Sequence, residues 1–402
     1  MQNPPYARGY VNYLSLLFFL TYGIIMLDAS SVTFFADVLM EQLHISTAQY
    51  AALNAVVWMA KAVSSIVVGL IANRTGHRKR YLAPLLLIAG VSSMLVVFAG
   101  SFFAILILRL LCGLCIGATL SMEMAILAKN ISGRDYGLRS GFVSAGSAVI
   151  ASALGPVLLT GIVMRWSWHS AFLFTGGMTF LMGVLVQCTV REVYFERQPR
   201  MDKNRDITVL LHNPVFLCCL LLGIFETAGK MILSTFGPLY LTEIMGLQTQ
   251  AKGSLLTVMG VVYIPVSLVV PALADRFSPK RVMAVTFALC LLSPLGMLFL
   301  EGSGWSVGLY VLFGNWAAAT VSIFIYLIPR EALPESVLGT ANGIIMGASV
   351  FFGGCVCPLI LGGFAETRAG IRSILIVCCG MFLLCILVSL LLQRWLKGQT
   401  DE

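Results

Sequence analysis

The stretch GLIANRTGHRKR, residues 69–80, places four cationic side chains directly after a long apolar segment. A second basic stretch, PALADRFSPKRV, stands 202 positions later at residues 271–282. Apolar segments that end in clusters of lysine and arginine are typical of membrane helices that leave the bilayer. The recurrence of this pattern predicts two similar halves, each of which crosses a membrane several times.

The composition argues against an ordinary soluble globule. Hydrophobic residues make up 58% of the 402 residues and charged residues 11%, whereas soluble domains have about 45–50% and about 25%. The apolar runs are unbroken over about 20 residues, the length of a membrane helix. They lack the alternation of barrel strands. The sequence therefore predicts an all-α membrane protein, and no part of it resembles a nucleotide-binding loop, a metal site or a cofactor site.

Twelve transmembrane helices are predicted, with both termini cytoplasmic. Most of the 26 lysine and arginine residues fall into loops on the side of the N-terminus, which the positive-inside rule places in the cytoplasm. The net charge of +8 then reflects these loops, and nucleic acid is not expected as a partner. We expect a multi-pass protein of the cell (inner) membrane. The predicted spans are 11–36, 48–72, 81–100, 102–128, 140–163, 171–190, 213–237, 252–274, 282–300, 306–329, 340–363 and 372–394.

A charged linker, residues 191–211, separates an N-terminal six-helix bundle, 1–190, from a C-terminal six-helix bundle, 212–402. The two bundles match each other at a constant offset of 202 positions. Because six is an even number, both halves have the same orientation, and we expect a parallel repeat with pseudo-symmetry. The matched pairs are Glu41 and Glu243, Arg74 and Arg276, Gly137 and Gly339, Pro156 and Pro358, and Gly161 and Gly363.

Three motifs resemble those of the major facilitator superfamily, and the resemblance covers essentially the whole chain. The first is the loop motif G-x-L-[AS]-D-R-x-G-R-[KR], which stands here at residues 69–80 with Asn73 for the usual Asp and His77 for the usual Arg. The second copy keeps Asp275 and Arg276. The fourth-helix motif is present as Arg109, Gly113 and Gly117, and the fifth-helix motif as Gly155-Pro156 followed by Gly161.

This resemblance implies a twelve-helix secondary transporter that works by alternating access, with a small-molecule substrate near the midplane. It also implies a monomer that is not an enzyme and has no cofactor. In the family the basic loop latches the two halves, so we expect Glu123, near the cytoplasmic end of the fourth span, to pair with Arg74 or Arg78. The residues assigned to gating are Gly69, Asn73, Arg74, Gly76, Arg78, Glu123, Gly155, Pro156, Asp275 and Arg276.

Five more ionisable residues fall within the predicted spans: Asp28, Lys61, Arg109, Glu226 and Lys230. A charge inside the bilayer normally faces a partner or a water-filled cavity, because burial without either is costly. Two interpretations remain open. In one, Asp28 pairs with Arg109 and Glu226 with Lys230, and these salt bridges hold the helices in register. In the other, the cations bind an anion while a carboxylate binds and releases a proton.

The surplus of cations favours proton-coupled uptake of a small organic anion. The alternative is a proton-coupled antiporter that exports drugs or metabolites, which the fifth-helix Gly-Pro motif favours. A non-transporting membrane sensor on the same fold is a third possibility. Polar residues that could line a substrate pocket complete the predicted binding site: Tyr22, Asn54, Tyr263, Asn315 and Asn342.

Overall fold

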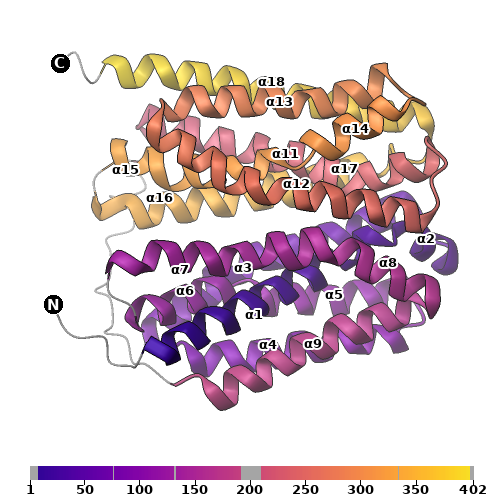
Figure 1. The fold of residues 1–402 in the computed structure, drawn as a ribbon, viewed down its shortest axis with the longest axis horizontal. Helices are drawn as coiled ribbons and strands as arrows, with labels where there is room; N and C mark the ends of the chain where they lie inside the picture. The colour runs from indigo at the N-terminus through magenta and orange to yellow at the C-terminus, as the bar shows by residue number, and fades with distance from the viewer. Residues whose placement is uncertain (1–7, 76, 131–132, 192–209, 334, 399–402) are drawn as a thin grey trace. The chain divides into compact units, whose positions relative to one another are not determined.

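The structure, a computed structural model, describes residues 8–75, 77–130, 133–191, 210–333 and 335–398, and these are mainly helical (Figure 1). Helices are the expected outcome for apolar segments of this length. Inside a bilayer there is no water to satisfy backbone N–H and C=O groups, and a helix satisfies them within one segment. The predicted all-α fold class is thus confirmed.

The N-terminal half begins with a long helix that is interrupted at Phe35. Most of its later spans are divided into shorter segments, whereas Thr47–Thr75 and Trp168–Thr189 are continuous helices. Its elements are α1 (Arg8–Phe34), α2 (Ala36–Leu43), α3 (Thr47–Thr75), α4 (Lys79–Leu95), η1 (Val96–Phe98), α5 (Phe102–Ile116), α6 (Thr119–Asn130), α7 (Gly133–Gly146), η2 (Ser147–Leu154), α8 (Gly155–Arg165) and α9 (Trp168–Thr189).

The C-terminal half follows the same plan. Its elements are α11 (Pro214–Glu243), α12 (Thr249–Arg276), α13 (Pro279–Phe299), α14 (Gly304–Phe313), η3 (Trp316–Thr320), η4 (Ile323–Leu327), α15 (Ile328–Ala332), α16 (Glu335–Ala348), η5 (Ser349–Val356), α17 (Cys357–Gly362) and α18 (Arg368–Gly398).

Within the described residues, eleven helical segments are long and apolar enough to cross a membrane. Each coincides with a predicted span to within a few residues, except that the seventh continues to Glu243 instead of ending at 237. The predicted span 48–72 coincides with α3, a continuous helix of 29 residues that is not among the eleven. The count of twelve and the cytoplasmic termini therefore stay predictions.

Helix starts follow local capping chemistry. Ser101 and Ser167 precede α5 and α9, and each side chain accepts a hydrogen bond from a backbone N–H three residues later at 3.3 Å. Asn213 precedes α11 and accepts from the N–H groups of Val215 and Phe216 at 2.9 and 3.2 Å. Pro214 occupies the first position of that helix, where a missing N–H has no cost. Such caps satisfy backbone donors that the helix leaves unpaired.

The chain divides into two compact units. The first unit comprises Met1–Ile45 with Val56–Pro199, and the second comprises Ser46–Ala55 with Arg200–Glu402. The first turns of α3 thus pack with the second unit, where Tyr50 and Asn54 both bond to Thr235. The remainder of α3 packs with the first unit, so this helix belongs to both.

The 202-residue repeat is visible in the elements themselves. α7 and α16, η2 and η5, and α8 and α17 start 202 positions apart. Both η2 and η5 are eight-residue π-helical segments, and each ends two residues before a proline, Pro156 or Pro358. A proline ring collides with the carbonyl four residues earlier, and the wider i→i+5 bonding of a π-helix accommodates this locally. The repeat therefore preserves an unusual backbone geometry.

Candidate functional site: charged residues within the spans

Asp28 and Arg109 form a fully buried ion pair in the first unit. Arg109 Nη1 lies 3.5 Å from Asp28 Oδ2, and the two side chains are 0% and 1% exposed. Arg109 Nη2 also donates to the backbone carbonyls of Asp28 and Ala29, at 2.8 and 3.0 Å. The guanidinium lies 5.6 Å from the centre of the Phe172 ring. Arg109 thus joins α5 to α1 through both charge and hydrogen bonds.

Three further donors surround the Asp28 carboxylate. Ser93 Oγ donates to Oδ2 at 2.6 Å, and Cys112 Sγ donates to the same oxygen at 3.1 Å. Thr175 Oγ1 donates to Oδ1 at 2.7 Å. These donors come from α4, α5 and α9. One carboxylate therefore ties together four helices of the first unit, and buried charge is tolerable because both oxygens are satisfied.

Gly113 and Gly117, which follow Arg109 in the fourth predicted span, lie against the backbone of α3. A Cβ atom at Gly113 would lie 2.6 Å from the Val57 carbonyl oxygen, and one at Gly117 would collide with the Lys61 carbonyl oxygen. Arg109, Gly113 and Gly117 are four residues apart and share one helix face. The two glycines permit α5 and the segment after it to pack directly on the backbone of α3.

Glu226 and Lys230 form an ion pair within a single helix of the second unit. Lys230 Nζ lies 3.5 Å from Glu226 Oε1, and both residues belong to α11. Glu226 is fully buried, whereas the Lys230 side chain is 25% exposed. The other carboxylate oxygen, Oε2, accepts from Thr227 Oγ1 at 3.0 Å. All of these contacts are made within one helix.

Lys61 is the second partly exposed cation within the predicted spans. It lies on α3, and its Nζ is 3.3 Å from Met26 Sδ and 4.8 Å from the centre of the Trp58 ring. An ammonium group over an indole ring is stabilised electrostatically, and most strongly where water is scarce. The aromatic ring holds the cation in place while leaving part of it accessible.

The predicted polar lining residues divide by exposure. Asn54 is buried, and its Nδ2 donates to Thr235 Oγ1 at 2.8 Å within the second unit. The others are partly exposed, and Tyr22 packs against the apolar core of the first unit. The partly exposed residues of this group are Tyr22, Tyr263, Asn315 and Asn342.

Of the gating residues in the basic stretches, Arg78 and Arg276 have described side chains. Arg78 is half-buried, and burial lowers the pKa of its guanidinium from the ordinary value. Arg276 is exposed at the end of α12. Gly76 lies outside the described residues. The predicted gating side chains of Asn73, Arg74 and Asp275 also lie outside them, as does Gly69 beyond its place in α3.

Glu123 and the Gly-Pro pair occupy interior positions of the first unit. Glu123 is fully buried in α6, and neither of its carboxyl oxygens forms a hydrogen bond within the described part of the chain. Gly155 and Pro156 are buried at the start of α8, directly after η2. The pairing of Glu123 with Arg74 or Arg78 stays a prediction.

The network around Asp28 includes residues that the sequence did not single out. Ser93, Cys112 and Thr175 are distributed over three helices, and the two hydroxyl donors stand 65 and 147 positions from Asp28. The sequence gives only a weak sign that a Ser or Thr within a span contacts a charge on another helix. Most such hydroxyls bond to the preceding turn of their own helix. The pairing of Asp28 with Arg109 was one of the two interpretations that the sequence left open, and the hydroxyl donors were not anticipated.

The charges within the spans differ in their accessibility. Asp28 and Arg109 neutralise each other out of reach of solvent. Lys61 and Lys230 keep accessible surface, one in each unit, and accessible cations can contact an anionic solute. Among the described residues, no group of three or more His, Cys, Asp or Glu side chains could hold a metal ion.

The chain is similar to known membrane proteins over most of its length. The chain is 21% identical to a hexuronate transporter of Escherichia coli strain K12 over 374 residues, which covers 85% of this chain and 84% of the relative. It is 25% identical to the multidrug resistance protein MdtL of Klebsiella pneumoniae strain 342, with 77% of this chain and 78% of the relative covered. One relative is thus named for hexuronate transport and the other for multidrug resistance.

Solved structures share the fold. A bacterial homologue of the human lysosomal transporter Spinster, in an inward-facing and unoccupied conformation, aligns with a TM-score of 0.81 at 14% identity over 97% of this chain and 98% of that chain. The nucleoside transporter NupG aligns with a TM-score of 0.74 at 14% identity over 96% and 99%. The sequence profile of the Major Facilitator Superfamily matches residues 18–358. Because that match spans most of the 402 residues, the chain belongs to the Major Facilitator Superfamily and is a multi-pass membrane transporter.

Proposed function

We propose that the protein is a secondary active transporter of the cytoplasmic membrane that takes up a small organic anion together with protons. It works as a monomer by alternating access between two six-helix bundles, residues 1–190 and 212–402, with both termini in the cytoplasm. The observation that carries the proposal is the accessibility of Lys61 and Lys230, in contrast to the fully buried Arg109. One relative is a hexuronate transporter, and because a hexuronate is a sugar acid, this similarity supports an anionic substrate class.

Coupling to protons follows from the Glu226–Lys230 pair. The Lys230 ammonium is held by the Glu226 carboxylate at 3.5 Å, and its side chain is 25% exposed. An incoming carboxylate that binds Lys230 competes with Glu226 for the same charge. Glu226 would then be left as a buried, unpaired carboxylate, which is costly unless it takes up a proton. Substrate and proton would therefore bind together and leave together.

The test is uptake by the full-length protein reconstituted into liposomes, first by counterflow with a panel of labelled anions, cations and neutral sugars. A pH gradient is then imposed with the best substrate. We expect an anion to be carried, with faster accumulation when the outside is more acidic. Transport of only cationic or neutral compounds would overturn the substrate class, and uptake that is indifferent to the pH gradient would overturn the proton coupling.

Lys61→Gln and Lys230→Gln provide the residue-level test. Both variants should fold and should lose most of the anion uptake, since each removes an accessible cation. Lys129→Gln is the matched control, because Lys129 is exposed at the end of α6 beyond the membrane span. Full uptake by both span variants would remove the basis of the proposal.

A proton-coupled exporter of drugs or metabolites is the second candidate. It is favoured by the Gly155-Pro156 pair at the end of η2 and by the multidrug resistance protein among the relatives. In this case a strain that lacks the transporter should be more sensitive to toxic compounds, and reintroduction of the gene should restore resistance. Unchanged sensitivity to a broad panel would leave anion uptake as the better assignment.

A further inference from the structure

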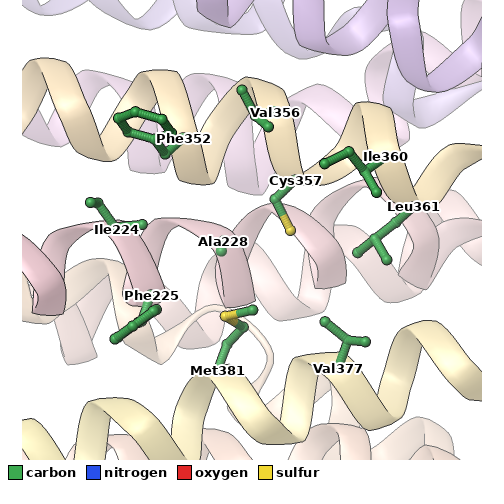
Figure 2. A pocket seen from close by; sticks show the side chains of 10 residues that line it. All are labelled: Ile224, Phe225, Ala228, Phe352, Val356, Cys357, Ile360, Leu361, Val377 and Met381. Carbon is green, nitrogen blue, oxygen red and sulfur yellow. The ribbon is translucent and has the colours of Figure 1, made fainter.

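An apolar groove lies in the second unit between three segments, one of which, α11, also holds Glu226 and Lys230 (Figure 2). α11 forms its floor with Ile224, Phe225 and Ala228, while η5–α17 and α18 form its two sides. The cavity has a volume of about 290 Å³, and no charged side chain lines it. Its partly exposed thiol, Cys357, is the most polar group in the lining.

The groove is elongated and parallel to the helices. Phe352, Val356 and Ile360 line one side at intervals of four residues, which corresponds to about 12 Å along a helix that rises about 1.5 Å per residue. On the opposite side Val377 and Met381 repeat the same interval. The long axis of the groove therefore follows the direction in which these segments cross the bilayer.

The depth of the groove places it among lipid chains. Its three walls belong to the membrane spans Pro214–Glu243, Ala341–Gly362 and Arg368–Leu392, and Ala228 and Met381 lie near the middle of theirs. Phe352 and Ile360 are exposed at its edge. Apolar walls offer water no hydrogen-bond partners, and an organic anion would lose its hydration there without compensation.

We propose that this groove binds one acyl chain of a bilayer phospholipid. The shape, the depth and the absence of charge all match a hydrocarbon chain aligned with the bilayer normal. Glu226 and Lys230 each stand two residues after a floor residue, which puts them about 200° around α11. The bound chain therefore supports α11 on the side opposite to the ion pair. This assignment concerns lipid and does not depend on which solute is transported.

The internal repeat is consistent with an apolar occupant. Val377 corresponds, at the offset of 202 positions, to Thr175 of the first unit. Thr175 donates a hydrogen bond to Asp28 at 2.7 Å, whereas Val377 presents only methyl groups to the groove. The second unit has thus replaced a polar contact between helices with a hydrocarbon surface.

The test uses the full-length protein in liposomes that contain a phosphatidylcholine with a photoreactive diazirine in the middle of one acyl chain. After irradiation, adducts are located by mass spectrometry. We expect groove residues such as Val377 and Met381 to be labelled several-fold more than Leu268 and Val285, which are exposed apolar residues of other spans in the same unit. Equal labelling per exposed surface would overturn the proposal.

A second experiment fills the groove with a larger side chain. Ala228→Leu should lower adduct formation in the groove several-fold and leave Leu268 labelling unchanged, and Cys357→Leu serves the same purpose if the first variant does not fold. Persistent groove labelling in a folded variant would contradict the proposal. Stronger labelling by a headgroup diazirine, or cross-linking of two copies through Cys357, would also overturn it by identifying another occupant.

Discussion

The two halves of this transporter place charges at corresponding positions but connect them in opposite ways. Asp28 in the first unit and Lys230 in the second are related by the offset of 202 positions. Asp28 is bonded to residues of three other helices and is 1% exposed. Lys230 has its ion-pair partner on its own helix and is 25% exposed. The repeat thus has a charge at the same position in both units, with opposite sign and different contacts.

The difference teaches how a charge in a membrane helix can serve either stability or function. A charge whose hydrogen bonds all go to neighbouring helices cannot leave them without exposing several unpaired polar groups. A charge paired within one helix can exchange its partner for a solute without disturbing the packing. We therefore interpret Asp28 and Arg109 as a pair that holds helices together, and Glu226 and Lys230 as a pair in which the lysine can exchange its partner for a solute.

The largest expected effect comes from Arg109→Met, which leaves the buried Asp28 carboxylate without its cation. Breaking a buried ion pair by removing one partner costs about 3–5 kcal/mol of folding stability. Thermal unfolding in detergent can be followed with a thiol-reactive dye, because Cys112 and Cys115 of the same unit are buried. Lys230→Met is the contrasting variant: Glu226 also loses its cation, but its contacts lie within one helix, so we expect a smaller loss of stability than for Arg109→Met.

Removing both partners sharpens the same test. Asp28→Asn combined with Arg109→Met should recover much of the lost stability, since no unpaired charge remains and coupled sites are not additive. Equal unfolding temperatures for Arg109→Met and Lys230→Met would show that the two pairs do not differ in the way proposed.

Much of the architecture was predictable because hydropathy and length act locally. The span 102–128 was predicted from its apolar run, and the structure has Phe102–Leu127. The sequence left the pairing of Glu226 with Lys230 as one of two interpretations, because they stand four residues apart on one helix, and the structure has them at 3.5 Å. Both inferences need only the periodicity of a single helix.

The remaining features depend on how helices face one another, which the sequence does not specify. Thr175 lies 147 positions from Asp28, and nothing in its immediate neighbourhood distinguishes it from other threonines in the spans. The exposure of Lys61 and the burial of Arg109 depend likewise on helix rotation. The Gly-Pro pair at 155–156 could be identified from the sequence. The π-helical bonding of the segment before it could not, because residue types do not determine the register of the backbone hydrogen bonds.

The second prediction exchanges the charges of the second unit through Glu226→Lys with Lys230→Glu. The pair stays within one helix, so the exchange should cost less stability than the corresponding exchange in the first unit. The accessible position now carries a carboxylate, and losing one charge-assisted contact to the anion, worth about 1.5–3 kcal/mol, should lower uptake about tenfold to hundredfold. Uptake in liposomes and thermal unfolding are measured on the same preparation.

The corresponding exchange in the first unit, Asp28→Arg with Arg109→Asp, is the contrasting variant. Ser93 and Thr175 present hydroxyl donors to position 28, and an arginine there offers them no acceptor, so we expect this variant not to fold. If both double variants fold and transport alike, the distinction between a pair that holds helices together and a pair that can exchange its partner is wrong.

The third prediction compares one hydroxyl in each unit. Thr175→Val removes a donor at 2.7 Å from a carboxylate held between helices, and leaving that oxygen unsatisfied should cost about 1–3 kcal/mol. Thr227→Val removes a donor at 3.0 Å from Glu226, which keeps its lysine, and should cost less. Unfolding temperatures of the two variants decide the order, and a larger loss for Thr227→Val would contradict the comparison.

The smallest effect is expected at an ion pair outside the bundle interior. Arg372 Nη2 lies 2.7 Å from Glu301 Oε2, which is shorter than either buried pair, but the arginine side chain is 58% exposed. Water already stabilises such charges, so the pair contributes only about 0–1 kcal/mol. Arg372→Gln should therefore unfold within a degree or two of the wild type, far from Arg109→Met. Added salt should not narrow this gap, because salt screens exposed charges and leaves buried ones nearly unaffected. A large loss at Arg372 would mean that the distance between charges, and not their burial, sets the cost of breaking a pair in this protein.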